Sequence, residues 1–125
     1  MTTTLHICIT CKKGGIDPDE NAERAGAHLY AAVQGLTLTN ALPEYLRILP
    51  VKCLSACNTG CAVALSATGK WAYVYGHMNP ENDAADILEG ARKYAASLDG
   101  IVPWRERPVI FRKQSLARIP PLEPS

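Results

Sequence analysis

Five cysteines in two groups are the residues of this sequence best suited to chemistry. Cys8 and Cys11 are separated by two residues, whereas Cys53, Cys57 and Cys61 follow one another at intervals of three intervening residues. Thiolates bind iron–sulfur clusters, Zn²⁺ and Cu(I), and a cysteine-only set of four can hold a [2Fe-2S] cluster without any histidine. Buried, inert cysteines are the alternative. Two tight groups favour a metal or redox centre.

The number of cysteines, the N-terminal residues and the hydropathy of the chain together favour a reducing compartment. An odd number of cysteines argues against a framework of disulfides. The opening residues MTTTLHICIT carry no basic region and no apolar stretch of signal-peptide length. No apolar run approaches the ~18 residues that a membrane-spanning helix needs. We therefore expect a cytoplasmic protein that is not embedded in a membrane.

A strand-like segment comes before each cysteine group. Residues 3–10 are rich in threonine and isoleucine, and residues 46–51 form a second strand in which Pro50 indicates an edge or a strand end. Between them, Asp17 and the residues after it have the features of a helix start, and an apolar stripe at helical spacing continues to about Leu36. Parallel strands of a βαβ unit end at the same sheet edge. The two cysteine groups are therefore expected to converge there.

The second half of the chain predicts a hairpin, a helix and a tail. Residues 61–66 and 70–75 are short β-branched and aromatic segments on either side of a turn. A helix is expected from about residue 79 to residue 98. Five prolines interrupt residues 101–125, which predicts an extended tail. The sequence thus indicates an α/β domain over residues 1–100, ordered β-α-β-β-β-α with a mixed sheet and two helices, and a basic, proline-containing tail over residues 101–125.

A resemblance to a known family can be read from the second cysteine group. The segment CLSACNTGCAVAL at residues 53–65, followed by GKWAYV at residues 69–74, resembles the cluster loop and next strand of thioredoxin-like [2Fe-2S] ferredoxins. It is also similar to the cluster-binding subunit of respiratory complex I. The resemblance extends over roughly residues 3–98 and implies a thioredoxin-like fold that binds a [2Fe-2S] cluster.

The same resemblance implies a set of ligands. Cys8, Cys53 and Cys57 take the places of the first, third and fourth ligands, and Cys11 is the remaining cysteine of the first group. The spacing of Cys8 and Cys11 is shorter than in the ferredoxins. Cys61 stands where many of them have proline, so it could replace Cys57 as the fourth ligand.

A second resemblance includes the tail. The first cysteine pair, the triple-cysteine loop and the segment DGIVPWRERP at residues 99–108 are similar to an uncharacterised bacterial family of predicted metal-binding proteins, often encoded near cobalamin-biosynthesis genes. This resemblance suggests a protein that serves cobalamin metabolism.

Two other chemistries stay open. Four thiolates also suit a site for zinc, cobalt or iron, as in a metallochaperone, although the three-residue spacing differs from the usual zinc knuckle. A C-x2-C after a strand is also typical of thiol-disulfide oxidoreductases. The segment KKGG at residues 12–15 delays the helix, however, and no proline lies between Val51 and Asn79 to face a dithiol. Because no nucleophile–base pair or phosphate loop is recognisable, we expect an electron carrier and not an enzyme.

The charge distribution indicates the kind of partner. The formal net charge is +1, which does not favour nucleic acid. Residues 101–125 nevertheless hold five basic residues against two acidic ones, whereas residues 1–100 hold eight against ten. We expect this tail to dock an acidic redox partner, while Trp104, Ile110 and Phe111 anchor it to its own domain or to a second copy in a homodimer. Its deletion is then expected to leave a bound cluster nearly unchanged.

Overall fold

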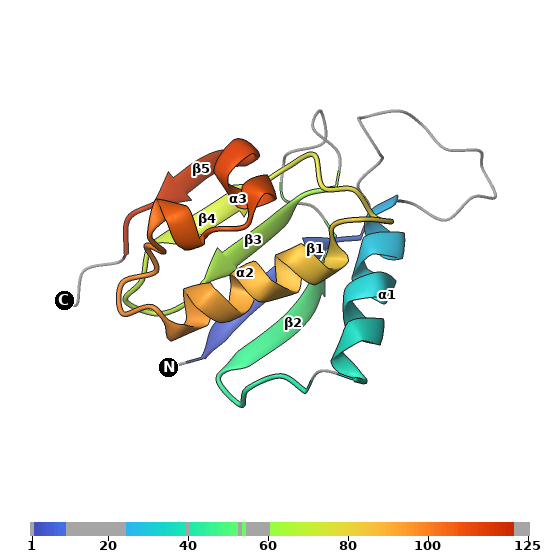
Figure 1. The fold of residues 1–125 in the computed structure, drawn as a ribbon, viewed down its shortest axis with the longest axis horizontal. Coiled ribbons are helices and arrows are strands. Elements are labelled where there is room, and N and C mark those ends of the chain that lie inside the picture. Colours follow the sequence, from blue (N-terminus) through green and yellow to red (C-terminus); the bar gives the residue numbers. More distant parts are fainter. Residues whose placement is uncertain (1, 10–24, 40, 53, 55–60, 122–125) are drawn as a thin grey trace.

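The protein is built on one five-stranded mixed sheet (Figure 1). The computed structural model describes residues 2–9, 25–39, 41–52, 54 and 61–121. The strands are β1 (Thr3–Cys8), β2 (Leu46–Val51), β3 (Val63–Ser66), β4 (Ala72–Tyr75) and β5 (Ser115–Ile119), in the spatial order β2-β1-β3-β4-β5. β1 and β2 are parallel, and the other neighbouring pairs are antiparallel. The expected mixed sheet, with β2 at one edge, is confirmed.

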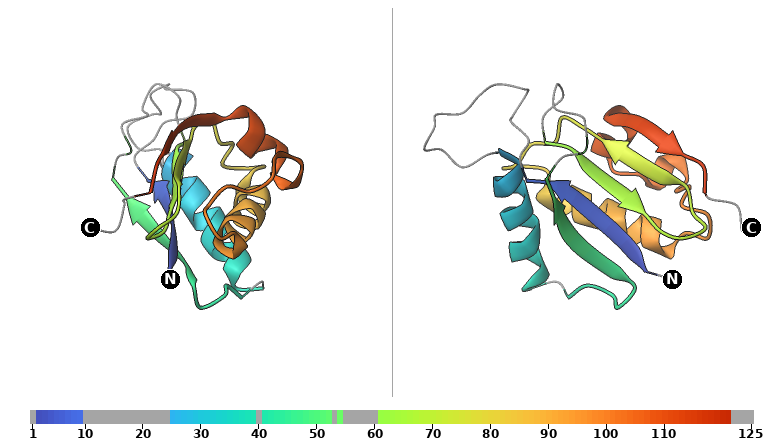
Figure 2. Two further views of the ribbon diagram at one scale, coloured as in Figure 1. Left: turned by 90° about the vertical axis from the view of Figure 1, so that its left-hand side faces the viewer. Right: turned by 180° about the vertical axis from the view of Figure 1, so that it is seen from behind.

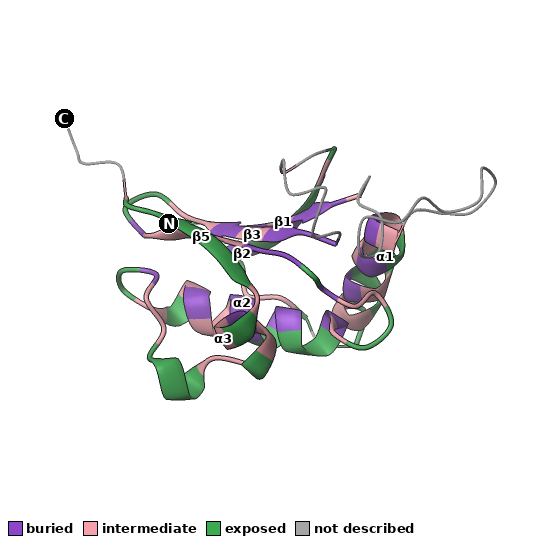
Figure 3. Ribbon diagram, turned by 90° about the horizontal axis from the view of Figure 1, so that it is seen from above, coloured by how far each residue is buried: buried purple, intermediate pink, exposed green. Residues whose placement is uncertain are grey.

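Three α-helices lie on the same face of this sheet (Figures 2 and 3). They are α1 (Ala25–Thr37), α2 (Ala84–Ala96) and the short α3 (Val109–Lys113), and a 3-10 turn, η2 (Trp104–Glu106), precedes α3. Their apolar side chains meet alternate residues of the strands in the main core, which includes Leu5, Ile7, Leu29, Val33, Val63, Leu65, Tyr73, Tyr75, Ile87, Leu88, Ala91, Tyr94 and Phe111. The period-2 alternation of the strands and the 3.6-residue period of the helices therefore produce two layers.

The two expected helices form, with shifted boundaries. The predicted start of the first helix lies outside the described residues, and its apolar stripe is observed as buried Leu29 and Val33 in α1. The second helix begins at Ala84 instead of near residue 79. The side-chain oxygen of Asn79 accepts hydrogen bonds from the backbone N–H groups of Glu81 and Asn82, at 2.8 and 3.2 Å. This side chain holds the preceding residues in a turn, because asparagine competes locally with helical hydrogen bonding.

The predicted hairpin is confirmed by the pairing of β3 with β4, and Gly100 fixes the far end of α2 against it. The backbone N–H of Trp71 donates to the carbonyl of Asp99 at 2.9 Å. Gly100 has a φ of +85°, and a Cβ at this position would lie 2.8 Å from the carbonyl oxygen of Trp71. Only glycine fits both the conformation and the close approach.

The C-terminal segment differs from the expected extended tail. It forms η2, α3 and β5, which pairs with β4 and extends the sheet. Phe111 is buried in the core, and a pair of prolines, Pro103 and Pro108, stand at the N-caps of η2 and α3. Proline is tolerated at a helix start because its missing N–H is not needed there. The prolines thus begin short helices and do not keep the chain extended.

In the part of the chain that the structure describes, none of the helices has the length and apolar character required to cross a bilayer.

Candidate metal centre

Cys8 lies at the end of β1, at the edge of the sheet where β2 also ends. Its register partner in the parallel pair is Val51, two residues before Cys53 along the chain. The Cys8 N–H donates to the carbonyl of Ala62 at 3.0 Å, and the Ile9 N–H donates to the carbonyl of Val51 at 2.9 Å. The strands that precede the two cysteine groups therefore end side by side, as the sequence predicts. Cys11, Cys53 and Cys57 lie outside the described residues.

The thiol of Cys8 sits in a small apolar cluster. It is buried with Ala62, and Val51 and Leu54 pack against this pair. The Cys8 Sγ lies 3.7 Å from the carbonyl oxygen of Lys52, to which a protonated thiol can donate a weak hydrogen bond. Metal binding requires the thiolate and would replace this bond. Ala62, Val51 and Leu54 thus limit the contact of the Cys8 side chain with water.

Cys61 occupies a different environment. It belongs to the main core, together with Val63 and Met78, and not to the small cluster around Cys8. Its carbonyl oxygen accepts a hydrogen bond from the Met78 N–H at 3.2 Å, and its φ of +22° places it at a bend before β3. Cys61 thus packs with Val63 in the main core, whereas Cys8 packs with Ala62 in the small cluster, so the two cysteines lie in different apolar environments.

Among the described residues, His6 is the titratable side chain of β1 that lies nearest to Cys8 along the chain. His6 lies two residues before Cys8 on β1, and burial, assisted by the positive charge of Arg47, lowers its pKa from the usual 6.5. The neutral imidazole is therefore favoured. Among the residues described by the structure, no group of three histidine, cysteine, aspartate or glutamate side chains is arranged to hold a metal ion.

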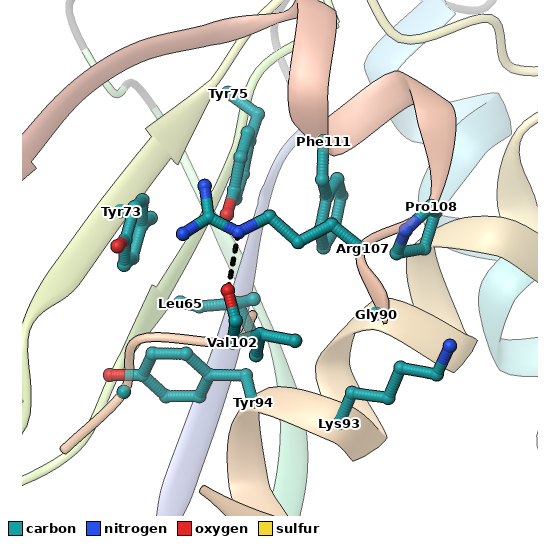
Figure 4. Close-up of a pocket in the computed structure, with 11 residues that line it drawn as sticks. Leu65, Tyr73, Tyr75, Gly90, Lys93, Tyr94, Val102, Arg107, Pro108 and Phe111 are labelled. Carbon is teal, nitrogen blue, oxygen red and sulfur yellow. Dashed lines mark hydrogen bonds between the residues drawn. The ribbon is translucent and has the colours of Figure 1, made fainter. Parts of the chain in front are cut away.

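An aromatic stack joins β4 to the C-terminal segment (Figure 4). The ring of Tyr75 stacks on Phe111 with centroids 4.0 Å apart and on Tyr73 at 5.9 Å. The Arg107 guanidinium lies over the Tyr73 ring, and its Nε donates to the carbonyl of Val102 at 2.7 Å. The cavity between these groups has a volume of only about 10 Å³. That space suits a single water, so the aromatic stack holds the tail in place and is not a small-molecule site.

The sequence predicts that Phe111 anchors the tail to its own domain or to a second copy, and the structure places this ring in the core of its own domain. The neighbour of the ring was not predicted, although Gly90 carried a signal for it. A Cβ at position 90 would lie 2.2 Å from the Phe111 ring, so the aromatic side chain takes the space over α2. Glycine inside a helix costs about 1 kcal/mol relative to alanine, which indicates a packing reason for its presence. Gly90 therefore indicated that another group packs closely against this helix, but the sequence did not show that the group is Phe111.

Comparison with family models decides the classification. A model described as a protein of unknown function, DUF1636, matches residues 5–121. The chain belongs to the DUF1636 family. The matched range spans both the sheet end that bears Cys8 and the segment from η2 to β5. A comparison with curated proteins gives no match.

Solved structures show which fold this DUF1636 chain adopts. It is similar to the thioredoxin-like [2Fe-2S] ferredoxin from Aquifex aeolicus, with a TM-score of 0.58 and 19% identity over 96% of this chain and 94% of the ferredoxin. A cysteine-to-serine variant of that ferredoxin gives a TM-score of 0.55 and 17% identity over 92% and 98% of the two chains. At such identities the similarity concerns the fold alone. The expected thioredoxin-like fold is confirmed.

Proposed function

We propose that this DUF1636 protein binds a [2Fe-2S] cluster through Cys8, Cys11, Cys53 and Cys57 and carries electrons. The observation that supports the proposal most is the pairing of Cys8 with Val51 in the parallel strands β1 and β2. Both strands therefore end at the same edge of the sheet, β1 at the first cysteine group and β2 just before the second. Similarity of fold to a [2Fe-2S] ferredoxin adds support from an independent source.

The described residues fit such a group. Cys8 is buried among Ala62, Val51 and Leu54, and its backbone N–H is already satisfied by the sheet. A shielded thiolate with apolar neighbours suits a cluster, whose potential depends on burial and on hydrogen bonds to sulfur. Cys61 packs into the main core, apart from the small cluster around Cys8. The fit therefore favours Cys57 as the fourth ligand.

In electron transfer, the protein itself would hold the cluster and shield it from water. The cluster, when bound, supplies a one-electron couple. Four thiolates provide the charge that balances the irons, while the apolar cluster around Cys8 limits access of water to that side. The rigid β1–β2 pair keeps the first thiolate in place, which reduces the reorganisation that accompanies a change of charge. No acid–base side chain is required for this role, and we infer a carrier that has no substrate of its own.

A metal site for zinc, cobalt or iron would use the same thiolates. The buried position of Cys8 suits either kind of site, since both need a deprotonated sulfur. A role in cobalamin metabolism, docking of an acidic redox partner, homodimer formation and a cytoplasmic location stay predictions.

An anaerobic redox titration tests the proposed function. The purified chain should be red-brown, and a one-electron reductant should bleach its visible absorption reversibly. A chain of the same composition that holds zinc would be colourless and would consume no reducing equivalents. A colourless protein that binds stoichiometric zinc, and that takes up no cluster on anaerobic reconstitution, would contradict the proposal.

A further inference from the structure

The two edges of the sheet differ in how they are protected. β2 forms one edge and contains Pro50, which has no backbone N–H to offer to another strand. β5 forms the other edge, all five of its residues are exposed, and its sequence SLARI contains no proline. In an antiparallel pair, about half of the backbone N–H and C=O groups of an edge strand point away from its neighbour. The pairing of β5 with β4 skips Leu116, which marks a bulge or irregularity, and the rest of β5 presents its outward main-chain groups along a proline-free edge.

The single charged residue of β5 is held within its own subunit. The Arg118 guanidinium lies 4.6 Å from the centroid of the Trp71 ring. A charged side chain that extends across an edge prevents strand pairing in many proteins. Arg118 instead stacks on a neighbouring aromatic residue, so its side chain does not protect the edge.

The surroundings of β5 combine apolar and basic side chains. Of the eight large apolar side chains that are exposed on the described residues, four lie in this segment, with exposed fractions between 42 and 59%: Trp104, Val109, Leu116 and Ile119. Among the described residues of this segment, the exposed basic residues are Arg105, Lys113 and Arg118, and the exposed acidic residue is Glu106. β5 and α3 are adjacent at this end of the molecule (Figure 1). We call this set of side chains together with β5 the β5 edge.

We propose that the β5 edge binds an extended, acidic segment of a partner protein, which adds to the sheet as a sixth strand. Main-chain hydrogen bonds to β5 would supply affinity, the exposed apolar residues would receive alternate side chains, and Arg105 and Lys113 would select acidic residues. A second copy of this chain fits less well, because it would bring the same basic residues against one another. The electrostatic complement of this edge is an acidic strand.

The position of the β5 edge suits a partner of an electron carrier, and this part of the inference rests on the proposed function. β5 is three strands away from β1 in the sheet order. At about 4.8 Å between neighbouring strands, this separation is about 14 Å. Ser115, the first residue of β5, pairs with Tyr75, which in turn pairs with Val63 next to the end of β1. The edge thus begins at the end of the sheet that bears Cys8.

A peptide of defined sequence can test the proposal on the full-length, anaerobically purified protein. The probe is a fluorescein-labelled ten-residue peptide that alternates glutamate and valine. One control peptide replaces each glutamate by lysine, and another carries N-methyl groups on alternate backbone nitrogens. Fluorescence anisotropy gives the affinity, and amide hydrogen exchange locates the contact. Iron and sulfide are measured on the same sample, so peptide binding without a cluster would refute only the proposed function.

We expect the acidic peptide to bind, the two control peptides to bind at least about tenfold more weakly, and the exchange of β5 amides to slow. The double variant R105E/K113E should lose about tenfold in affinity for the acidic peptide, because both residues are exposed basic groups of the segment that leads into β5. The matched control R47E alters an exposed arginine on the opposite edge strand and should change the affinity less than about twofold.

Three results would overturn the inference. Equal binding of the N-methylated peptide would exclude strand addition, and an unchanged exchange rate of the β5 amides would place the contact elsewhere. Concentration-dependent dimerisation of the wild-type protein, with the β5 amides protected in the absence of peptide, would assign this edge to a second copy.

Discussion

The ring of Phe111 occupies the place where a side chain at position 90 would stand. A Cβ added to Gly90 would lie 2.2 Å from the nearest atom of the Phe111 ring. The ring of Tyr75 stacks on the Phe111 ring, with the two centroids 4.0 Å apart. One aromatic side chain of the C-terminal segment is thus fitted between α2 and β4. This relationship makes the segment from η2 to β5 part of the fold.

Substitution at this contact should lower stability. Gly90→Ala forces the Phe111 ring to move and should destabilise the protein by about 1–3 kcal/mol, the usual cost of overpacking. Phe111→Ala should cost about 3–5 kcal/mol, because it empties a buried site. The free energy of unfolding in urea measures both effects. Val109→Ala, at an exposed position of the same helix, is the control and should change stability by less than about 0.5 kcal/mol.

Removal of residues 101–125 should affect the whole domain. The truncation takes away β5 and Phe111, and it exposes the buried ring of Tyr75 to water. We predict a melting temperature at least about 10 °C lower than that of the full chain, measured by circular dichroism, because several kcal/mol of apolar burial are lost. A truncated chain that melts within about 2 °C of the full chain would show that the tail only rests on the surface.

Alkaline pH should weaken the fold through Tyr94. Burial, with a further contribution from Tyr73, raises the pKa of Tyr94 from 10.0 to about 12. Between these values the unfolded chain loses this proton and the folded chain keeps it, so stability that is fully present below pH 10 falls as the pH rises toward 12. Lys70 works in the opposite direction, since burial lowers its pKa.

A variant isolates the contribution of Tyr94. The hydroxyl of Tyr94 donates to the Trp71 carbonyl at 2.5 Å, so Tyr94→Phe should cost about 1–3 kcal/mol at neutral pH. The variant should also lose stability less steeply above pH 10 than the wild type does. Urea unfolding at several pH values measures this slope, and an identical slope in both proteins would mean that other groups cause the alkaline loss.

The five cysteines should divide into ligands and a core residue. Replacement of Cys8, Cys11, Cys53 or Cys57 by serine should abolish or severely weaken cluster assembly, as judged by the visible spectrum and the iron content. Cys61→Ala should keep the full spectrum and lose about 1–2 kcal/mol of stability, because Cys61 is buried in the apolar core. Loss of the cluster in Cys61→Ala, together with its retention in Cys57→Ser, would exchange the roles of these two residues.

Strand pairing at the cysteine end could be predicted from the sequence because it depends on local features. Residues 46–51 were predicted as a strand in which Pro50 indicates an edge or a strand end, and the structure has the edge strand β2 there. Parallel pairing with β1 followed from the helix between the two strands. The start of the second helix was misplaced because the side chain of Asn79 forms a turn that periodicity does not reveal.

The remaining features depend on contacts between distant segments. The spacing of Cys57 and Cys61 left the fourth ligand open, because the packing of Cys61 in the main core depends on contacts with segments distant in sequence. Similarly, the prolines of the tail suggested an extended chain, since the fit of Phe111 to Gly90 is a property of the folded surface. Local patterns determine the elements, and complementary shapes decide how the C-terminal elements pack.

The iron and acid-labile sulfide content of the anaerobically purified, full-length protein tests the central claim most directly. Thiolates supplied by the two cysteine groups after β1 and β2 would suit a rhombic cluster, and we therefore expect about two irons and two sulfides per chain. Zinc as the sole bound metal, with no labile sulfide before or after anaerobic reconstitution, would contradict it.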